Sequence, residues 1–270
     1  MIFRRVFLAV FVGALVSISM ALADSPTTVP TPAPATRMSF TDPAHPEPEP
    51  ADVPDFRHGK YGEISSPWNK KHKANLARAK AGKIDLLFLG DSITDFWATK
   101  GKEVWDKTYG NMNAADFGIS GDLTQHVLWR INNGGELDGI SPKVVVLMIG
   151  TNNYLYTGEH ILGADTEIVK ELHEKLPTTK VLLLGIFPRG ADPNDPKWGP
   201  IREKFKVINK GLAALDDGDK TRFLDIGDKF LDADGKIPPD IMPDALHPSA
   251  KGYQIWADAM APLLNQMMQN

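Results

Sequence analysis

The sequence predicts a three-layer α/β/α sandwich built around a five-stranded parallel sheet. Five short apolar segments alternate with longer segments in which apolar residues recur at helical spacing. Strands that are apolar throughout are typical of sheets covered by helices on both faces, and parallel strands need helical crossovers. The chain is organised around one of these strands, because the apolar run 86–89 stops abruptly at Gly90-Asp91-Ser92.

The elements follow one another in a regular order after a short helix that contains Trp68 and Leu76. Strands are expected at 84–89, 114–117, 143–149, 180–187 and 221–226. Helices are expected at 122–131, 161–176, 201–215 and 249–268. In the last helix the residues with helical spacing are assigned to the core: Tyr253, Trp256, Ala257, Met260, Leu263, Leu264 and Met267.

Residues 1–23 have the pattern of a signal peptide. Arg4 and Arg5 precede an apolar stretch of about 15 residues, which ends before the small residues of Ala21-Leu22-Ala23. The alternative is a transmembrane anchor, but a bilayer-spanning helix needs about 20 apolar residues. We therefore expect cleavage after Ala23, export to the periplasm or the medium, and no stable membrane insertion afterwards.

Residues 24–55 form a second segment, which we interpret as a disordered tether ahead of a catalytic domain at 56–270. Prolines occupy positions 26, 30, 32, 34, 43, 46, 48, 50 and 54, and large apolar residues are almost absent. Such a composition buries too little surface to offset the entropy of ordering the chain. A Pro-x-x-Pro ligand for a partner domain is the alternative interpretation.

Charge and cysteine content exclude several kinds of partner. The chain contains no cysteine, so its fold owes nothing to disulfides. Without residues 1–23 it carries 28 basic and 34 acidic residues, a net charge of −6. An acidic chain is a poor partner for nucleic acid or an anionic membrane surface, and it suits a small-molecule or carbohydrate substrate.

Four short polar blocks are expected on one rim of the sheet. Three follow strands, namely Gly90-Asp91-Ser92, Phe117-Gly-Ile-Ser-Gly-Asp122 and Gly150-Thr-Asn-Asn153, and the fourth, Asp244-Ala-Leu-His247, precedes the last helix. Open α/β sheets place their chemistry at the carboxyl ends of the strands. A serine hydroxyl needs an imidazole to take its proton, and an aspartate can orient that imidazole. The blocks therefore contain the ingredients of a hydrolase triad.

These blocks resemble those of the SGNH, or GDSL, hydrolase family. Within the family the likeness is nearest to the catalytic subunits of platelet-activating-factor acetylhydrolase and their bacterial relatives. It covers roughly residues 84–265 and includes Gly118-Ile-Ser-Gly-Asp-Leu-Thr-Gln-His-Val-Leu-Trp-Arg130 and Gly185-Ile-Phe-Pro-Arg-Gly190. The resemblance implies the SGNH hydrolase fold, with a flavodoxin-like sheet.

The resemblance also implies roles for individual residues. Ser92 would be the nucleophile, His247 its general base and Asp244 the carboxylate that orients the imidazole. The oxyanion hole would consist of the backbone N–H groups of Ser92 and Gly121 and the side-chain amide of Asn152. This chemistry needs no cofactor, and no histidine–carboxylate spacing in the sequence predicts a metal site.

The residues next to the catalytic positions predict a shallow acyl pocket. Ile93, Thr151 and Leu246 each adjoin a catalytic residue, and in the resembling acetylhydrolases the matching positions bound such a pocket. The alternative is that they only pack the core beneath the rim. Asp91 is expected to cap a turn or helix, and His126 and Arg130 to belong to a structural polar network.

The predicted function is that of an exported serine esterase which hydrolyses short-chain, acetyl-type esters through an acyl-enzyme. An acetylated carbohydrate would fit export and the acidic surface. A lysophospholipase or thioesterase of the same fold is the first alternative. An inactive carbohydrate-binding relative is the second.

Overall fold

The computed structural model describes residues 50–60 and 62–269. Its five strands are all parallel and lie in the order β2-β1-β3-β4-β5. They are β1 (Leu86–Gly90), β2 (Ala114–Gly118), β3 (Val144–Met148), β4 (Lys180–Leu184) and β5 (Thr221–Leu224). This flavodoxin-like order confirms the predicted sheet, and it reverses direction between β1 and β3, where open sheets bind their ligands.

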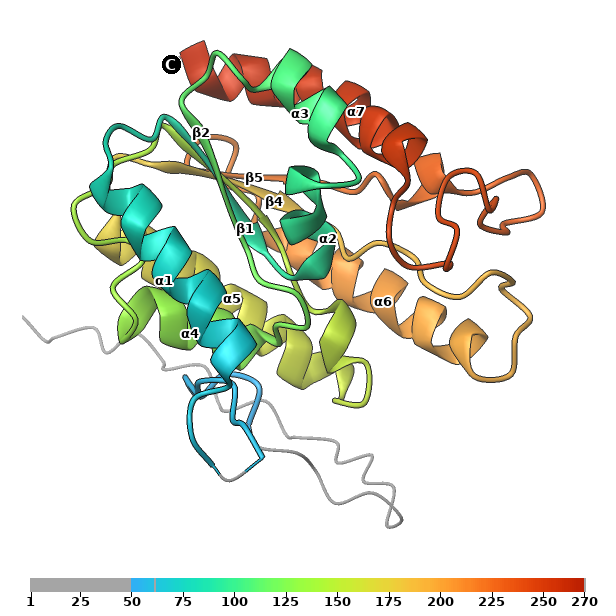
Figure 1. Cartoon of the computed structure of the whole chain (residues 1–270). Helices are drawn as coiled ribbons and strands as arrows, with labels where there is room; N and C mark the ends of the chain where they lie inside the picture. The colour runs from blue at the N-terminus through green and yellow to red at the C-terminus, as the bar shows by residue number, and fades with distance from the viewer. Residues whose placement is uncertain (1–49, 61, 270) are drawn as a thin grey trace, which may run out of the picture. The chain divides into compact units, whose positions relative to one another are not determined.

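Helices cover both faces of the sheet (Figure 1). Alternate residues of β1 enter different cores, with Leu87 and Leu89 on one side and Leu86 and Phe88 on the other. The first core contains residues of α1 (Ser66–Lys80), α4 (Thr124–Asn132), α5 (Gly158–Lys175) and α6 (Trp198–Leu212). The second contains residues of α2 (Ser92–Asp95), η1 (Phe96–Ala98), α3 (Lys102–Thr108) and α7 (Ala250–Gln269). The predicted three-layer sandwich is therefore confirmed.

The elements differ from the predicted ones mainly at their ends. Short 3₁₀ turns follow several of them: η2 (Thr151–Asn153), η3 (Ala213–Leu215) and η4 (Gly227–Phe230). The predicted strand 180–187 ends at Leu184, and Ile186 and Phe187 are buried in the loop beyond it. Because loop residues that pack beneath a catalytic rim are as apolar as strand residues, hydrophobicity alone overextends the strand.

The predicted core of the last helix agrees with the structure except at one position. Tyr253, Trp256 and Met260 are completely buried, whereas Leu263 is only partly buried at the edge of the core. Pro262 lies inside α7 without ending it.

The N-terminal boundary lies earlier than the sequence predicted. Residues 1–23 and 24–49 are outside the described residues, but residues 50–55 pack on the domain. Ala51 is completely buried, and its carbonyl accepts a hydrogen bond from Thr124 Oγ1 at 2.9 Å. The N–H of Asp55 donates to the carbonyl of Gln125 at 3.1 Å. Composition could not predict these contacts, because they are made by backbone groups and one small side chain. In the described part of the chain, no helix is long and apolar enough to cross a membrane.

Candidate active site

The nucleophile position is built by the end of β1. Gly90 is the last residue of the strand. A Cβ on this residue would lie 2.4 Å from the Met148 carbonyl oxygen, so the close approach of β1 to β3 requires glycine here. Asp91 then caps α2, because its Oδ1 accepts the N–H of Ile93 at 2.9 Å. Burial raises the pKa of Asp91 to about 7. Ser92 is the first residue of α2, and only 7% of it is exposed.

Ser92, His247 and Asp244 form one chain of hydrogen bonds. Ser92 Oγ lies 2.9 Å from His247 Nε2, and His247 Nδ1 lies 2.7 Å from Asp244 Oδ2. With the Nδ1 proton donated to the carboxylate, Nε2 is left as the acceptor for the serine hydroxyl, which is the tautomer that a general base needs.

Asp244 also fixes the loop that carries the imidazole. Its Oδ1 accepts the backbone N–H groups of His247 at 2.7 Å and Leu246 at 3.2 Å, and Ala245, which follows Asp244, has a φ of 55°. Burial acts to raise the pKa of Asp244, but the hydrogen bonds and charge of His247 outweigh it, so this pKa lies below its usual value. Asp244 therefore keeps its negative charge opposite the imidazole.

Two aromatic residues that the sequence did not assign to the site support this arrangement. The ring of Phe96 lies 4.9 Å from the ring of His247, centroid to centroid. The hydroxyl of Tyr253 donates to the carbonyl of Ile93 at 2.7 Å and so joins α7 to the helix that begins with the nucleophile. The helical spacing of apolar residues correctly placed Tyr253 in the core, but it could not predict the hydrogen bond of the hydroxyl.

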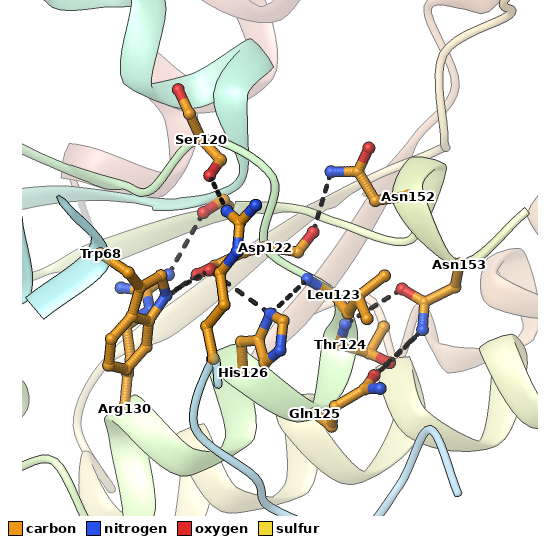
Figure 2. Close-up of polar contacts among 12 residues, drawn as sticks. Trp68, Ser120, Asp122, Leu123, Thr124, Gln125, His126, Arg130, Asn152 and Asn153 are labelled. Carbon is orange, nitrogen blue, oxygen red and sulfur yellow. Dashed lines mark hydrogen bonds and ion pairs between the residues drawn. The ribbon is translucent and has the colours of Figure 1, made fainter. Parts of the chain in front are cut away.

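A hydrogen bond joins Asn152 in the third block to the second block, next to Gly121. Asn152 Nδ2 donates to the carbonyl of Asp122 at 2.9 Å, as Figure 2 shows. Gly121 has a φ of 81°, in the region that favours glycine. Within the described residues, no hydrogen bond engages the backbone N–H groups of Ser92 or Gly121. These two N–H groups, together with the second hydrogen on Asn152 Nδ2, remain free to bind an oxygen.

A buried ion network holds the second block in place (Figure 2). Arg130 is completely buried, and its Nε donates to Asp122 Oδ2 at 2.9 Å. It also donates to the carbonyls of Phe117 at 2.9 Å and Gly90 at 3.2 Å, and it pairs with Glu136. Arg130 thus ties the ends of β1 and β2 to the loop that contains Gly121, which is the structural role expected for it.

His126 and Asn153 join the same region without reaching the catalytic serine. Burial lowers the pKa of His126 to about 4, so its ring is neutral and Nδ1 accepts the N–H of Leu123 at 3.1 Å. The Oδ1 of Asn153 accepts the N–H of Thr124 at 3.0 Å, and its Nδ2 donates to Gln125 Oε1 at 3.1 Å, which attaches the third block to the start of α4.

The three residues predicted to wall an acyl pocket are not equivalent in the structure. Ile93 is 1% exposed and belongs to the core on the α7 side of the sheet, and Thr151 is completely buried. Neither presents surface that a substrate could touch, since their side chains turn inward from the rim. Leu246 is half-buried at the edge of the core and keeps some exposed surface. Packing, the alternative weighed for these residues, describes Ile93 and Thr151.

The described residues contain no group of three or more histidine, cysteine, aspartate or glutamate side chains arranged to hold a metal ion. The arrangement of Ser92, His247 and the free N–H donors suits chemistry by a polarised serine.

Comparison with known proteins places this site in a family. The model of the GDSL-like lipase/acylhydrolase family matches residues 88–255. The alpha1 subunit of platelet-activating factor acetylhydrolase IB from Bos taurus is 38% identical over 202 residues, which cover 74% of this chain and 84% of that protein. The chain belongs to the GDSL-like lipase/acylhydrolase family. It is an ester hydrolase, as the four blocks predicted.

Another relative and two solved structures also resemble this chain. The alpha2 subunit of platelet-activating factor acetylhydrolase IB from Rattus norvegicus is 35% identical over 203 residues, 75% of this chain and 85% of its own. A GDSL-like lipase from Bacteroides thetaiotaomicron superposes with a TM-score of 0.60 at 19% identity, over 72% of this chain and 97% of the other. An acetylxylan esterase from Geobacillus stearothermophilus superposes with a TM-score of 0.52 at 19% identity, over 67% and 93%. At these identities the two structures show the shared fold.

Proposed function

We propose that this protein is an exported serine esterase that removes short acyl groups, acetyl above all, from carbohydrate esters through an acyl-enzyme on Ser92. The observation that carries the catalytic part is the contact of 2.9 Å between Ser92 Oγ and His247 Nε2, with Asp244 on the other ring nitrogen.

In the first half of the reaction, Ser92 Oγ attacks the ester carbonyl carbon while His247 Nε2 takes the hydroxyl proton. The carbonyl oxygen becomes an oxyanion, which the N–H groups of Ser92 and Gly121 and the amide of Asn152 receive. His247 then passes its proton to the departing alcohol, and the acyl group remains on Ser92.

In the second half, water replaces the alcohol. His247 takes a proton from the water, the hydroxide attacks the acyl carbon, and the same donors bind the second oxyanion. Collapse of this intermediate returns the proton to Ser92 and releases the carboxylic acid. Asp244 stays ionised throughout and stabilises the imidazolium, in accord with its lowered pKa.

Two kinds of relative support acetyl as the acyl group. The curated relatives are named acetylhydrolases, and one of the structural neighbours is named an acetylxylan esterase. The signal-peptide pattern at 1–23 and the acidic chain favour an exported enzyme with an uncharged carbohydrate substrate. The alternative substrate is a lipid ester of the platelet-activating-factor type, which the names of the curated relatives favour.

One set of measurements tests the proposal. A serine-directed organophosphonate should add to the purified protein once, on Ser92, and Ser92→Ala and His247→Ala should abolish esterase activity with little change in melting temperature. Acetylated xylo-oligosaccharides and an acetylated ether phospholipid are then compared as substrates. Activity within a few-fold of wild type in either variant would contradict the assignment of the triad. Faster turnover of the phospholipid would contradict the proposal that the substrate is a carbohydrate ester.

A further inference from the structure

Arg57, which precedes the family match at 88–255, lies against the peptide group that joins Ser120 to Gly121. Its Nη1 donates to the carbonyl oxygen of Ser120 at 2.8 Å. A Cβ on Gly121 would lie 2.6 Å from this nitrogen and 3.2 Å from Cζ. Gly121 therefore leaves the space that the guanidinium occupies, in addition to adopting its positive φ.

The geometry of a trans peptide connects this contact with the active site. No cis peptide bond occurs in the described part of the chain, so the C=O of Ser120 and the N–H of Gly121 point in opposite directions across one rigid plane. A hydrogen bond that fixes the carbonyl also fixes the direction of the N–H. A charged donor on the carbonyl polarises the peptide as well, and this strengthens the N–H as a donor on the other side.

Arg57 is itself held firmly by the segment that carries it. Its carbonyl accepts the N–H of Ser65 at 2.8 Å, and an antiparallel bridge joins the next residue, His58, to Ile64. No ion pair in the described residues involves Arg57. The contact with Ser120 is therefore made by a guanidinium that forms no ion pair with a carboxylate of the described chain.

We propose that Arg57 is a positioning residue for the oxyanion hole, and that it orients and polarises the Ser120–Gly121 peptide so that the Gly121 N–H meets the developing oxyanion. This inference rests on the proposed role of Gly121. It also makes the two non-serine donors alike, because each is held from the side that faces away from the substrate: Gly121 through the Ser120 carbonyl, and Asn152 through the Asp122 carbonyl.

The test compares Arg57→Met with a matched control, Arg78→Met, on p-nitrophenyl acetate. Arg78 is also half-buried and also donates to backbone carbonyls, those of Gly82 and Lys83, but it lies at the end of α1. We expect kcat of Arg57→Met to fall about 10-fold, a fraction of the ~10²-fold or more that loss of a whole oxyanion donor costs. KM should change less than about twofold. Arg57→Lys, which keeps a charged donor, should recover most of kcat, and Arg78→Met should match wild type.

A second readout separates this role from simple loss of stability. A trifluoromethyl ketone forms a tetrahedral oxyanion adduct with serine, so its affinity should fall in Arg57→Met by about the same factor as kcat. The affinity for the product acetate should stay within about twofold. If Arg57→Met does not fold, Arg57→Gln is measured in its place, with an intermediate loss of kcat expected.

Several results would overturn the inference. One is a wild-type kcat in a folded Arg57→Met or Arg57→Gln variant, even with a lower melting temperature, which would leave Arg57 a structural role only. Another is an unchanged kcat with a raised KM, which would make Arg57 a substrate contact. If Ser92→Ala stays active, the proposed function itself fails and this inference fails with it. Loss of activity in Ser92→Ala together with wild-type kinetics in Arg57→Met overturns this inference alone.

Discussion

The side-chain nitrogen of Asn152 has two hydrogens, and one of them is already donated to the Asp122 carbonyl at 2.9 Å. That bond stops the amide from rotating, so the second hydrogen keeps a fixed direction before any substrate arrives. Donors that are fixed in advance lower a barrier more than donors that must reorient during the reaction. The Asp122 carbonyl thus fixes the direction in which Asn152 donates its second hydrogen.

Asn152→Ala should lower kcat by roughly 10²–10³-fold, with a smaller effect on KM, because the lost donor acts mainly on the oxyanion. Steady-state kinetics on p-nitrophenyl acetate measure both constants. Asn265→Ala, an exposed asparagine near the end of α7, serves as the control and should behave as wild type. An unchanged kcat with a raised KM would show instead that Asn152 binds substrate.

Leu246 sets the second prediction at the residue scale, because it is the one predicted wall residue that keeps exposed surface beside His247. If its side chain limits the space for the acyl group, each added methylene meets an overpacking cost of about 1–3 kcal/mol. The specificity constant of the wild type should fall roughly 10-fold or more from acetyl to butyryl esters. Leu246→Ala should partly restore the longer esters and leave acetyl turnover similar. A wild type that prefers octanoyl esters would show that Leu246 bounds no such pocket.

Sequence reasoning could find the residues whose chemistry is written in short blocks, such as Ser92, Asn152 and His247. It could not find Arg57 or Phe96, because no local pattern relates an arginine just after a proline-rich stretch to a carbonyl 63 residues later. It also failed where adjacency in sequence was taken for adjacency in space. Ile93 follows the nucleophile, but in a helix the next side chain points about 100° away, here into the core.

At the scale of elements, the sequence predicted strands well and one helix not at all. Five strands were found because each contains a short apolar stretch between helical patterns, although the fourth was predicted to run past its end at Leu184. α3 was missed because Val104 and Trp105 are neighbours in a charged stretch and show no helical repeat. Val104 is nonetheless buried and Trp105 partly buried in the core beside α7, so tertiary packing decides the structure of this segment.

α5 contains a buried carboxyl group that offers a test of stability. Both oxygens of Asp165 are buried without a hydrogen-bond partner in the described residues, and Oδ2 lies beneath Gly150 at the start of the third block. Burial, with a smaller contribution from Asp91, raises the pKa of Asp165 well above its usual value. Above the pKa of an unfolded aspartate, folding then requires the chain to hold a proton that the unfolded chain would release. The contribution of this site to stability therefore falls as the pH rises toward the raised pKa.

Asp165→Asn should accordingly raise the melting temperature at pH 8 by a few degrees, since relief of a buried unpaired group is worth about 1–3 kcal/mol. The gain should shrink as the pH is lowered toward 4, where the aspartate is protonated as well. Thermal melts across this pH range measure the effect. Asp234→Asn, in an exposed turn, is the control and should show no such trend. A gain that is equal at both pH values would mean that the charge of Asp165 is not what destabilises the fold.

At the scale of the whole molecule, the catalytic rim is assembled from both ends of the described chain. Asp244 and His247 come from the loop before α7, and Arg57 comes from the segment before α1. Between them, β1 and β3 lie in the middle of the sheet, so the rim is supported on both sides by packed helices (Figure 1). This arrangement predicts that the segment 50–58 contributes to both stability and turnover.

The comparison that tests this is between a chain that begins at residue 50 and one that begins at residue 59. The first keeps every described contact and should have the melting temperature and kcat of the full chain. The second loses the buried Ala51, the hydrogen bonds of Ala51 and Asp55 to α4, and the contact of Arg57 with Ser120. At about 1 kcal/mol for each hydrogen bond, its melting temperature should fall by about 5–10 °C, and kcat should fall about 10-fold. Arg57→Met in the longer chain should reproduce the loss of kcat with only a small part of the loss of stability. Equal stability and activity in the two truncated chains would show that residues 50–58 contribute nothing measurable to the domain.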